Sequence, residues 1–354
     1  MGKAEMSRRA HACSATAGAL LVSFFSTTAG SPGAQAQGTF PPVLATYVTK
    51  DVKLTPAEQA QLAAGKPVTK LLDADASKEV GIFGAVWIKA PIARYVAAVQ
   101  DIENFEKGEN FLVTKRISSP PGPEDFARLS FTSEELKDLK ACKIGECDLK
   151  LGEAGLARIK SEVDWSKPTA NADAERVIRT LALEYVNGYL EGGNARLAQY
   201  RDSNRPTFVA QEFASMVERM PELTVYLPSL KRYLLDYPNV TEPATDSFLY
   251  WQHVKFGLKP TIRINHVAIF NQPTHTEVVS KMLYASHYFW TALELRVLIP
   301  DPARGDGFWF VNVNRSRSDG LSGFVGSLIR GKVRGEAQKG MEAALTMTKS
   351  RMES

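Results

Sequence analysis

The sequence predicts an α+β protein, because strand patterns and helix patterns occupy separate stretches of the chain. Strand-like runs lie at 82–89 and 111–117, and strand patterns return over 261–314. Residues 122–257 between them have helical character, and the chain ends in one long amphipathic helix from about Leu321. Strands grouped together and helices grouped together are typical of the α+β class.

The first 36 residues match a secretory signal peptide. Lys3, Arg8 and Arg9 form a positive N-terminal region, a mildly apolar stretch follows, and Ala34-Gln35-Ala36 is an A-x-A cleavage site. The apolar stretch is far shorter than the roughly 20 residues of a membrane-spanning helix. A disordered N-terminus and an uncleaved anchor are the alternatives. We expect cleavage between about Ala36 and Gln37 and a periplasmic or secreted protein, with the export route open.

The charge balance argues against a nucleic-acid partner. The chain has 43 Lys and Arg against 39 Asp and Glu, a net charge of +4 over 354 residues. A nucleic-acid-binding protein would need a concentrated basic face. The length suits one elaborated domain or two ordinary ones.

Two cysteines follow the expected signal peptide, Cys142 and Cys147, with Gly145 between them. Outside the cytoplasm, cysteines this close are expected to form a disulfide, and Gly145 would help the chain to fold back. A zinc site would need about four ligands, and no histidine lies nearby in the sequence. A redox pair usually has C-x-x-C spacing, which this segment lacks. We therefore expect a structural disulfide, no metal site and no cofactor.

The elements before the helical block are expected in a simple order. Residues 37–80 are a lead-in, in which Thr55 caps a short helix that starts at Pro56. The strand 82–89 comes next, followed by a helix with apolar residues at helical spacing and by the strand 111–117.

The helical block begins with a capping signal, in which Thr132 precedes Glu135 by three residues. A long helix is expected over about 172–189. Further helices are expected at about 206–219, 222–236 and 245–256.

Strand character then returns and leads to the last helix. Strands are expected at 261–270, twice within 278–297 with a break near His287, and at 308–314. The last helix has an apolar stripe of amphipathic spacing: Leu321, Phe324, Val325, Leu328, Val333, Ala337, Met341 and Leu345.

This order of elements resembles the START-like, or helix-grip, superfamily of lipid-transfer domains and polyketide cyclases, in an elaborated form seen in secreted bacterial proteins of unknown function. The resemblance is carried by Gly84-Ala85-Val86-Trp87-Ile88-Lys89-Ala90-Pro91 with Val96 and Val99, and by the hairpins up to Asn314 followed by Asp319-Gly320-Leu321. It covers about 80–120 and 260–350.

The resemblance implies an antiparallel sheet around the long C-terminal helix, with a deep apolar cavity between them. A START-like domain would then span 81–354, with 122–257 as a large helical insertion that has no counterpart in the superfamily. Candidate ligand-binding residues are the aromatic cluster and two helix glycines: Tyr284, Tyr288, Trp290, Phe308, Phe310, Gly331 and Gly335. Glycines permit close approach to the backbone. Filling of the core by the aromatic side chains and close helix packing at the glycines are the alternatives.

Catalytic signals are weak. His266 and His287 lie on predicted strands, where either is a candidate base, although a lone strand histidine is more often solvated or hydrogen-bonded. Residues 326–332 have most of a P-loop spacing, but Val333 stands where Ser or Thr is needed and the segment is helical.

Three functions follow from these observations. The preferred one is periplasmic binding or transport of an apolar small molecule or lipid. The alternatives are a cyclase or hydratase that uses a cavity histidine, and a protein-interaction module built on the helical insertion. A basic face on the last helix would suit transient contact with an anionic membrane surface, with a solvated polar face as the alternative: Arg330, Lys332, Arg334 and Lys339.

Overall fold

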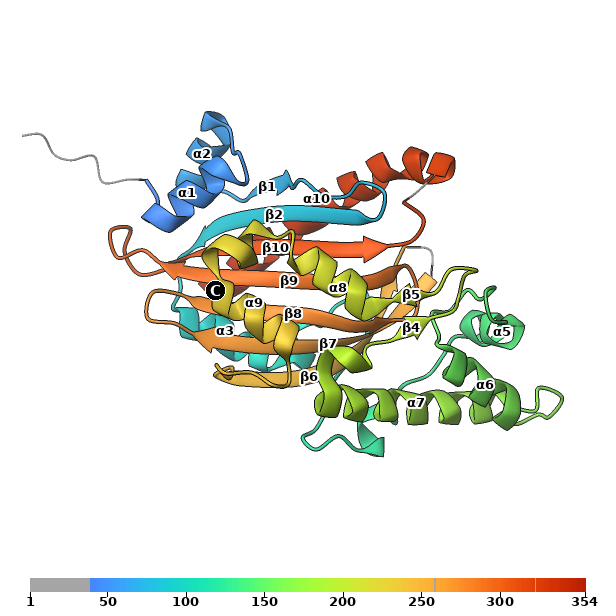
Figure 1. Ribbon diagram of the computed structural model, residues 1–354. Helices are drawn as coiled ribbons and strands as arrows, with labels where there is room; N and C mark the ends of the chain where they lie inside the picture. Colours follow the sequence, from blue (N-terminus) through green and yellow to red (C-terminus); the bar gives the residue numbers. More distant parts are fainter. Residues whose placement is uncertain (1–38, 258, 322) are drawn as a thin grey trace, which may run out of the picture. The chain divides into compact units, whose positions relative to one another are not determined.

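The computed structural model describes residues 39–257, 259–321 and 323–354 (Figure 1). Its centre is an eight-stranded antiparallel sheet in the order β1-β2-β10-β9-β8-β7-β6-β3. Strands β6 to β10 follow one another along the chain and pair as successive neighbours, while β1 and β2 lie at one edge and β3 at the other. The strands of this sheet are β1 Val68–Leu71, β2 Glu79–Ile88, β3 Phe111–Arg116, β6 Asp246–Phe256, β7 Lys259–Asn271, β8 Thr276–Ala285, β9 Phe289–Pro300 and β10 Phe308–Ser318.

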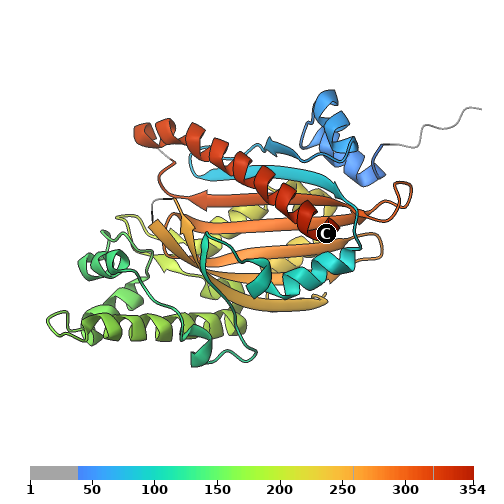
Figure 2. The same cartoon turned by 180° about the vertical axis from the view of Figure 1, so that it is seen from behind.

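The C-terminal helix α10 (Gly323–Glu353) packs against β1 and β2 on one face of the sheet, and α3 (Ile92–Gln100) and α4 (Ile102–Phe105) belong to the same layer (Figure 2). Met341 and Leu345 of α10 lie directly over Gly84 of β2, where an added Cβ would come within 2.7 Å of Met341 Cγ. Polar contacts fix the end of the helix, because Lys349 Nζ donates to the Trp87 carbonyl at 2.6 Å. The second half of α10 is therefore held firmly against the sheet.

The opposite face of the sheet is covered by helices from two distant parts of the chain (Figure 1). One group packs on β9, β10 and β2 and comprises α1 Pro42–Lys50, α2 Pro56–Ala63, α8 Val209–Val217, the π-helical turn η3 Glu222–Tyr226 and α9 Pro228–Asp236. Another group packs toward β6, β7 and β8 and comprises the short turn η1 Pro123–Phe126, α5 Ser133–Ala141, α6 Glu153–Glu162, α7 Ala170–Gly192 and η2 Gly193–Arg196. A two-stranded ribbon, β4 Gln199–Tyr200 and β5 Thr207–Phe208, connects the two groups.

The α+β class, the antiparallel sheet against the long C-terminal helix and the intervening helical region are confirmed. Both capping predictions are also confirmed. The Thr55 hydroxyl accepts from the Glu58 amide at 3.2 Å, and Thr132 does the same for Glu135, with each glutamate accepting from the cap amide in return. Among the described residues, no helix is both long enough and apolar enough to cross a bilayer. The predicted signal peptide and its cleavage site lie outside the described residues.

The helix predicted at 245–256 is wrong, because this segment is strand β6. It pairs with β7 from Asp246 to Phe256 and with β3 on its other side. Residues 248–254 are all buried, so the strand lacks the alternation of polar and apolar residues that marks a half-exposed strand. A short run that is apolar on both faces cannot be told from a buried helix by periodicity alone.

The apolar stripe expected on the last helix is present in α10, but only part of it is buried. Leu328 is 67% exposed and Val333 is 37% exposed, whereas Met341 and Leu345 are buried. An added Cβ at Gly331 or Gly335 would meet nothing within 4 Å. Gly331 and Gly335 are therefore not required for close approach to the sheet.

Gly84→Ala and Gly335→Ala should change stability in opposite directions. The methyl group at 84 would collide with Met341 and Leu345, and overpacking of this kind costs about 1–3 kcal/mol. The methyl group at 335 meets open space, and alanine in a helix is favoured over glycine by up to about 1 kcal/mol. Urea denaturation measures both changes, and a destabilised Gly335→Ala would show that this stretch packs closely against another part of the protein.

Candidate functional site

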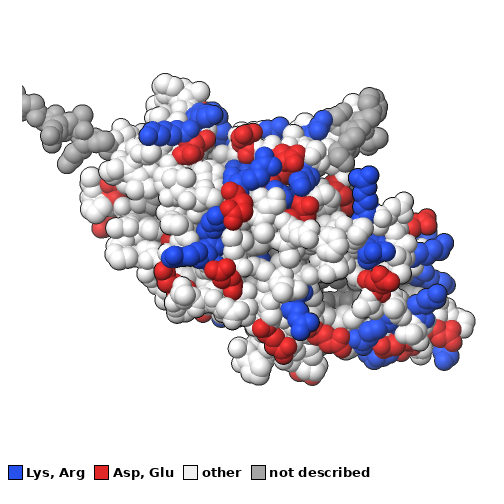
Figure 3. Space-filling view, in the orientation of Figure 1, with Lys and Arg blue, Asp and Glu red and all other residues white. Residues whose placement is uncertain are grey.

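An apolar pocket of about 540 Å³ lies on the sheet face opposite α10, between α1, the segment from η3 to Leu227, and strands β9 and β10. Val311 is paired with Val297 and Val313 with Leu295, so these four side chains form one continuous apolar wall. The pocket is lined by Pro41, Pro42, Val43, Leu44, Tyr47, Glu222, Tyr226, Leu227, Thr274, His275, Leu295, Val297, Ile299, Pro300, Val311 and Val313. In Figure 3 the left part of the surface, on the side of α1 and the turn between β9 and β10, carries few charged side chains.

One acidic side chain, Glu222, lies among these lining residues. It is 4% exposed, and its Oε1 atom accepts a hydrogen bond from the Tyr47 hydroxyl at 2.6 Å. Its Oε2 atom has no hydrogen-bond partner among the described residues. Burial, and then the negative charge of Glu222, raise the pKa of Tyr47 well above its ordinary value, so the tyrosine stays a donor. The pocket therefore combines apolar walls with one buried carboxylate, and one oxygen of this carboxylate has no hydrogen-bond partner among the described residues.

Local structure places Glu222 at this point. Pro221 precedes it, and the following residues form the π-helical turn η3 instead of a regular helix. Single π turns are rare and are frequently found at functional sites. Tyr47 comes from α1, 175 residues earlier, and its ring packs edge-on against Phe83 and Tyr226. Two segments far apart in the sequence thus build the polar part of the pocket.

The predicted ligand-binding residues do not line this pocket. Phe308 and Phe310 point to the α10 side of the sheet and pack against the ring of Tyr95. Their ring centroids lie 6.5 and 5.1 Å, respectively, from the centroid of the Tyr95 ring. Tyr284 and Trp290 pack at the α7 side, and the Tyr288 hydroxyl accepts from the Lys259 amide at 2.7 Å. Gly331 and Gly335 of α10 have open space beside them. The structure therefore does not bring these residues into one site.

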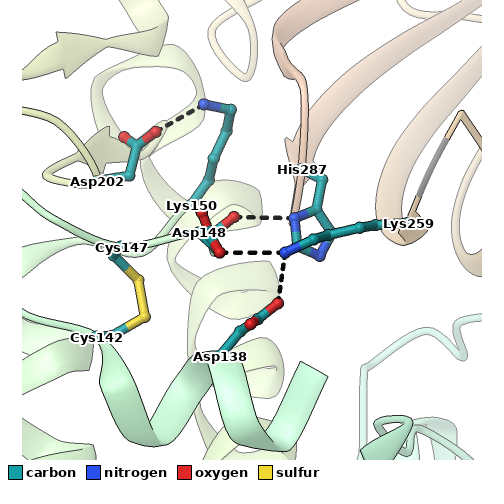
Figure 4. Close-up of a disulfide and its surroundings, with 8 residues drawn as sticks. All are labelled: Asp138, Cys142, Cys147, Asp148, Lys150, Asp202, Lys259 and His287. Carbon is teal, nitrogen blue, oxygen red and sulfur yellow. Dashed lines mark hydrogen bonds and ion pairs between the residues drawn. A yellow bond between two sulfur atoms is a disulfide. The ribbon is translucent and has the colours of Figure 1, made fainter. Parts of the chain in front are cut away.

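His287 lies beside the disulfide, in the turn between β8 and β9 (Figure 4). Its Nδ1 atom is 2.9 Å from the Asp148 carbonyl, and burial lowers the pKa of the imidazole. Lys259 pairs with Asp138 at 2.6 Å and with Asp148 at 3.2 Å in the same region. This arrangement ties the turn to the segment around the disulfide.

The expected disulfide between Cys142 and Cys147 is confirmed, with Cα atoms 4.4 Å apart. Gly145 has a positive φ of 84°, as expected for a chain that folds back between the two cysteines. The Gly145 amide donates to the Arg201 carbonyl at 2.7 Å, so the small loop is anchored to the chain near β4. A disulfide is typical of proteins in oxidising compartments.

His266 belongs to a buried chain of hydrogen bonds. Its Nε2 atom is 2.7 Å from the Ser247 hydroxyl, and its Nδ1 atom is 2.8 Å from the Tyr189 hydroxyl of α7. Lys281 lies 3.5 Å from the same tyrosine oxygen and also donates to Asn194. This chain joins strands β6, β7 and β8 to the helices that cover them.

The electrostatics of this chain disfavour catalysis by His266. Burial, and then the nearby charge of Lys281, lower the pKa of His266 to about 3. An efficient general base has a pKa near the working pH, so an imidazole that stays neutral down to pH 3 is a poor one. Burial lowers the pKa of Lys281 to about 7, and no carboxylate bonds to this lysine among the described residues.

The sequence reasoning missed Glu222 and Tyr47, although a partial signal was present. The alternation of Leu295, Val297 and Ile299 marks one apolar strand face, but it does not show that the layer above leaves a cavity. Among the described residues, no group of three or more His, Cys, Asp or Glu side chains is placed to hold a metal ion.

No protein-family model matches the chain, and a comparison with curated proteins finds no match. The assignment of function therefore rests on the fold and on the geometry of the pocket.

Lys281 should make stability depend on pH above neutrality. The unfolded lysine keeps its proton to about pH 10, whereas the folded one loses it near pH 7, so the unfolded chain binds more protons between these values. Stability should therefore rise with pH from about 7 to 9, by up to about 1.4 kcal/mol per pH unit.

Lys281→Met should remove this pH dependence, and the matched variant Lys255→Met, at an exposed position on β6, should retain it. Urea denaturation at pH 7, 8 and 9 gives the free energy of unfolding of each protein and hence its slope against pH. Parallel slopes for the parent and Lys281→Met would contradict the buried-lysine assignment.

Proposed function

We propose that the protein binds an apolar small molecule or lipid chain in the pocket between α1 and strands β9 and β10. The observation that carries the proposal is a cavity of about 540 Å³ with almost entirely apolar walls and one buried carboxylate. Ligand pockets of proteins commonly have volumes of about 300–1,000 Å³, apolar linings and few polar groups. The resemblance to the START-like superfamily, whose members include lipid-transfer domains, supports the same ligand class.

The proposed site differs in position from the cavity expected between the sheet and the C-terminal helix. On the α10 side, Met341 and Leu345 lie directly on Gly84, and Phe308 and Phe310 pack around Tyr95. The opposite face offers the open apolar wall formed by β9 and β10. We therefore place the ligand on that opposite face.

We also propose that the protein works outside the cytoplasm. The disulfide between Cys142 and Cys147 and the predicted signal peptide support this location.

An enzyme that uses His266 is disfavoured by the low pKa of that residue. The helical insertion exposes large apolar residues at separate positions, Ile144, Phe208 and Val225, and single exposed apolar residues are ordinary on protein surfaces.

Filling the pocket should abolish binding of an apolar probe. Val297→Trp places a large ring in the wall, whereas Leu112→Trp adds the same ring at an exposed position on β3. Diphenylhexatriene, which is neutral and fluoresces in apolar surroundings, serves as the probe. We expect at least a tenfold loss of affinity in Val297→Trp, relative to the parent, and none in Leu112→Trp. Equal binding by the parent and both variants would place the probe elsewhere.

Contact of α10 with an anionic membrane remains a separate prediction. The first half of the helix exposes Leu328, Ile329 and Val333 beside basic residues. Each basic residue near such a surface contributes about 1 kcal/mol. Arg330→Glu with Arg334→Glu should lower co-sedimentation with phosphatidylglycerol vesicles at least tenfold.

The control for this experiment is the pair Lys160→Glu and Lys167→Glu, which makes the same charge change at exposed positions in the helical insertion. The control should bind vesicles as the parent does, and binding of the parent should fall as salt is added. Equal binding of the parent to neutral phosphatidylcholine vesicles would contradict an electrostatic contact.

A further inference from the structure

We infer that the ligand of the apolar pocket ends in a hydrogen-bond donor that binds the free oxygen of Glu222, with a protonated amine preferred over a hydroxyl. This inference rests on the proposed function of the pocket and specifies the chemical class of the ligand. It is carried by the position of one buried carboxylate and by the partners of every polar group around it.

Within the described residues, only one of the two carboxylate oxygens of Glu222 has a hydrogen-bond partner. Oε1 accepts from Tyr47, while Oε2 is buried and has no partner among the described residues. Buried polar atoms in folded proteins are nearly always hydrogen-bonded, and an unpaired charged atom is the costly exception. Glu222 also lines the pocket, so a ligand donor that reaches Oε2 would complete the hydrogen bonding of this carboxylate.

The other polar groups of the pocket are already engaged. The Tyr226 hydroxyl donates to Asp51 at 2.6 Å. The Nε2 atom of His275 lies 2.9 Å from the Glu277 carboxylate, and its Nδ1 atom lies 3.0 Å from the Thr274 hydroxyl. No Lys or Arg occurs among the described residues that line the pocket. Glu222 is therefore the pocket's available polar contact, and it is an acceptor with a negative charge.

Arg315 on β10 has only part of its guanidinium engaged, because its Nε atom has no hydrogen-bond partner among the described residues, and its positive charge opposes the rise in the pKa of Tyr47. Arg315, which follows the pocket wall on β10, bonds to Glu79 at 3.0 Å and to the Asp73 carbonyl at 2.9 Å. Its charge is shared with a separate ion cluster that contains Arg317 and Glu212. No ion pair joins Arg315 to Glu222 among the described contacts, so a cationic ligand group would be the direct ion-pair partner of Glu222.

These features rank the possible head groups of the ligand by their expected affinity for Glu222. A carboxylate would face the negative charge of Glu222, and an ether or ester would offer only acceptors. A hydroxyl would donate one neutral hydrogen bond. An ammonium group would donate a charge-assisted bond, which is roughly twice as strong as a neutral one. The row Leu295, Val297 and Ile299 extends about 13 Å along the strand, which suits one linear apolar chain behind the head group.

The test uses four ligands with the same twelve-carbon chain, each below its micelle concentration: dodecylamine, dodecanol, dodecyl methyl ether and dodecanoate. Isothermal titration gives their affinities for the parent and for Glu222→Gln. In the parent we expect dodecylamine to bind at least tenfold more tightly than the methyl ether, with dodecanol between them and dodecanoate weakest. Glu222→Gln should remove the preference for the amine and leave binding of the ether unchanged.

Two further variants serve as controls. Glu218→Gln removes one negative charge from an exposed side chain near η3 and should keep the amine preference. Tyr47→Phe removes the internal donor while keeping the carboxylate, so the amine preference should persist or increase. Tyr47→Phe therefore tests the carboxylate even if Glu222→Gln folds poorly.

The outcomes separate the inference from the proposed function. Failure of all four ligands to bind the parent would overturn the proposed function and, with it, the inference. Binding of the methyl ether as tightly as the amine would leave the apolar pocket standing and overturn the role of Glu222. An amine preference that survives in folded Glu222→Gln would also overturn that role.

Discussion

The structure depends on burial of both faces of its central sheet. Strands β7 and β8 are buried along nearly their whole length, so apolar side chains emerge on each side and need a covering layer. The second half of α10, with α3 and α4, covers one face. The helical region between β3 and β6, together with α1, covers the other face, which would otherwise expose Leu293, Leu295 and Trp309 to water. This helical region is therefore part of the core.

Buried charged side chains on one face of the sheet differ in whether they have a partner of opposite charge. On the insertion side, Glu79 of β2 is fully buried and is paired with both Arg315 and Arg317 of β10, and Arg317 also reaches Glu212 of α8. A buried charge is tolerated when it is paired and hydrogen-bonded in this way. Lys281 lies on the same face and has no carboxylate partner among the described residues, so burial lowers its pKa without an opposing charge.

The sequence predicted the parts of the fold that depend on local chemistry. The capping boxes at Thr55 and Thr132 and the disulfide between Cys142 and Cys147 involve residues within a few positions of each other, so their patterns are visible in one short segment. The strand β6 was missed because burial on both faces removes its alternation. The exposed half of α10 was missed because amphipathic spacing indicates an apolar face without showing what lies against it.

The candidate site could not be predicted for a different reason. Glu222 and Tyr47 meet across 175 residues, and their contact exists only because α1 and η3 cover neighbouring parts of the same strands. No local pattern marks either residue, since an isolated glutamate near a proline or a tyrosine in a short helix is common. Only the fold shows that one carboxylate oxygen lies buried in an apolar wall.

The presence of that carboxylate is difficult to explain by folding alone. An apolar side chain at position 222 would complete the layer over β9 and β10 without an unpaired charge, and replacing buried charged groups by well-packed apolar ones is often neutral or stabilising. Tyr47 donates to one oxygen, and the other has no partner among the described residues, so burying this carboxylate costs stability. Stability is commonly given up where a site must recognise a ligand. The proposed ligand site therefore rests on an oxygen that has no partner among the described residues and belongs to a residue lining an apolar pocket.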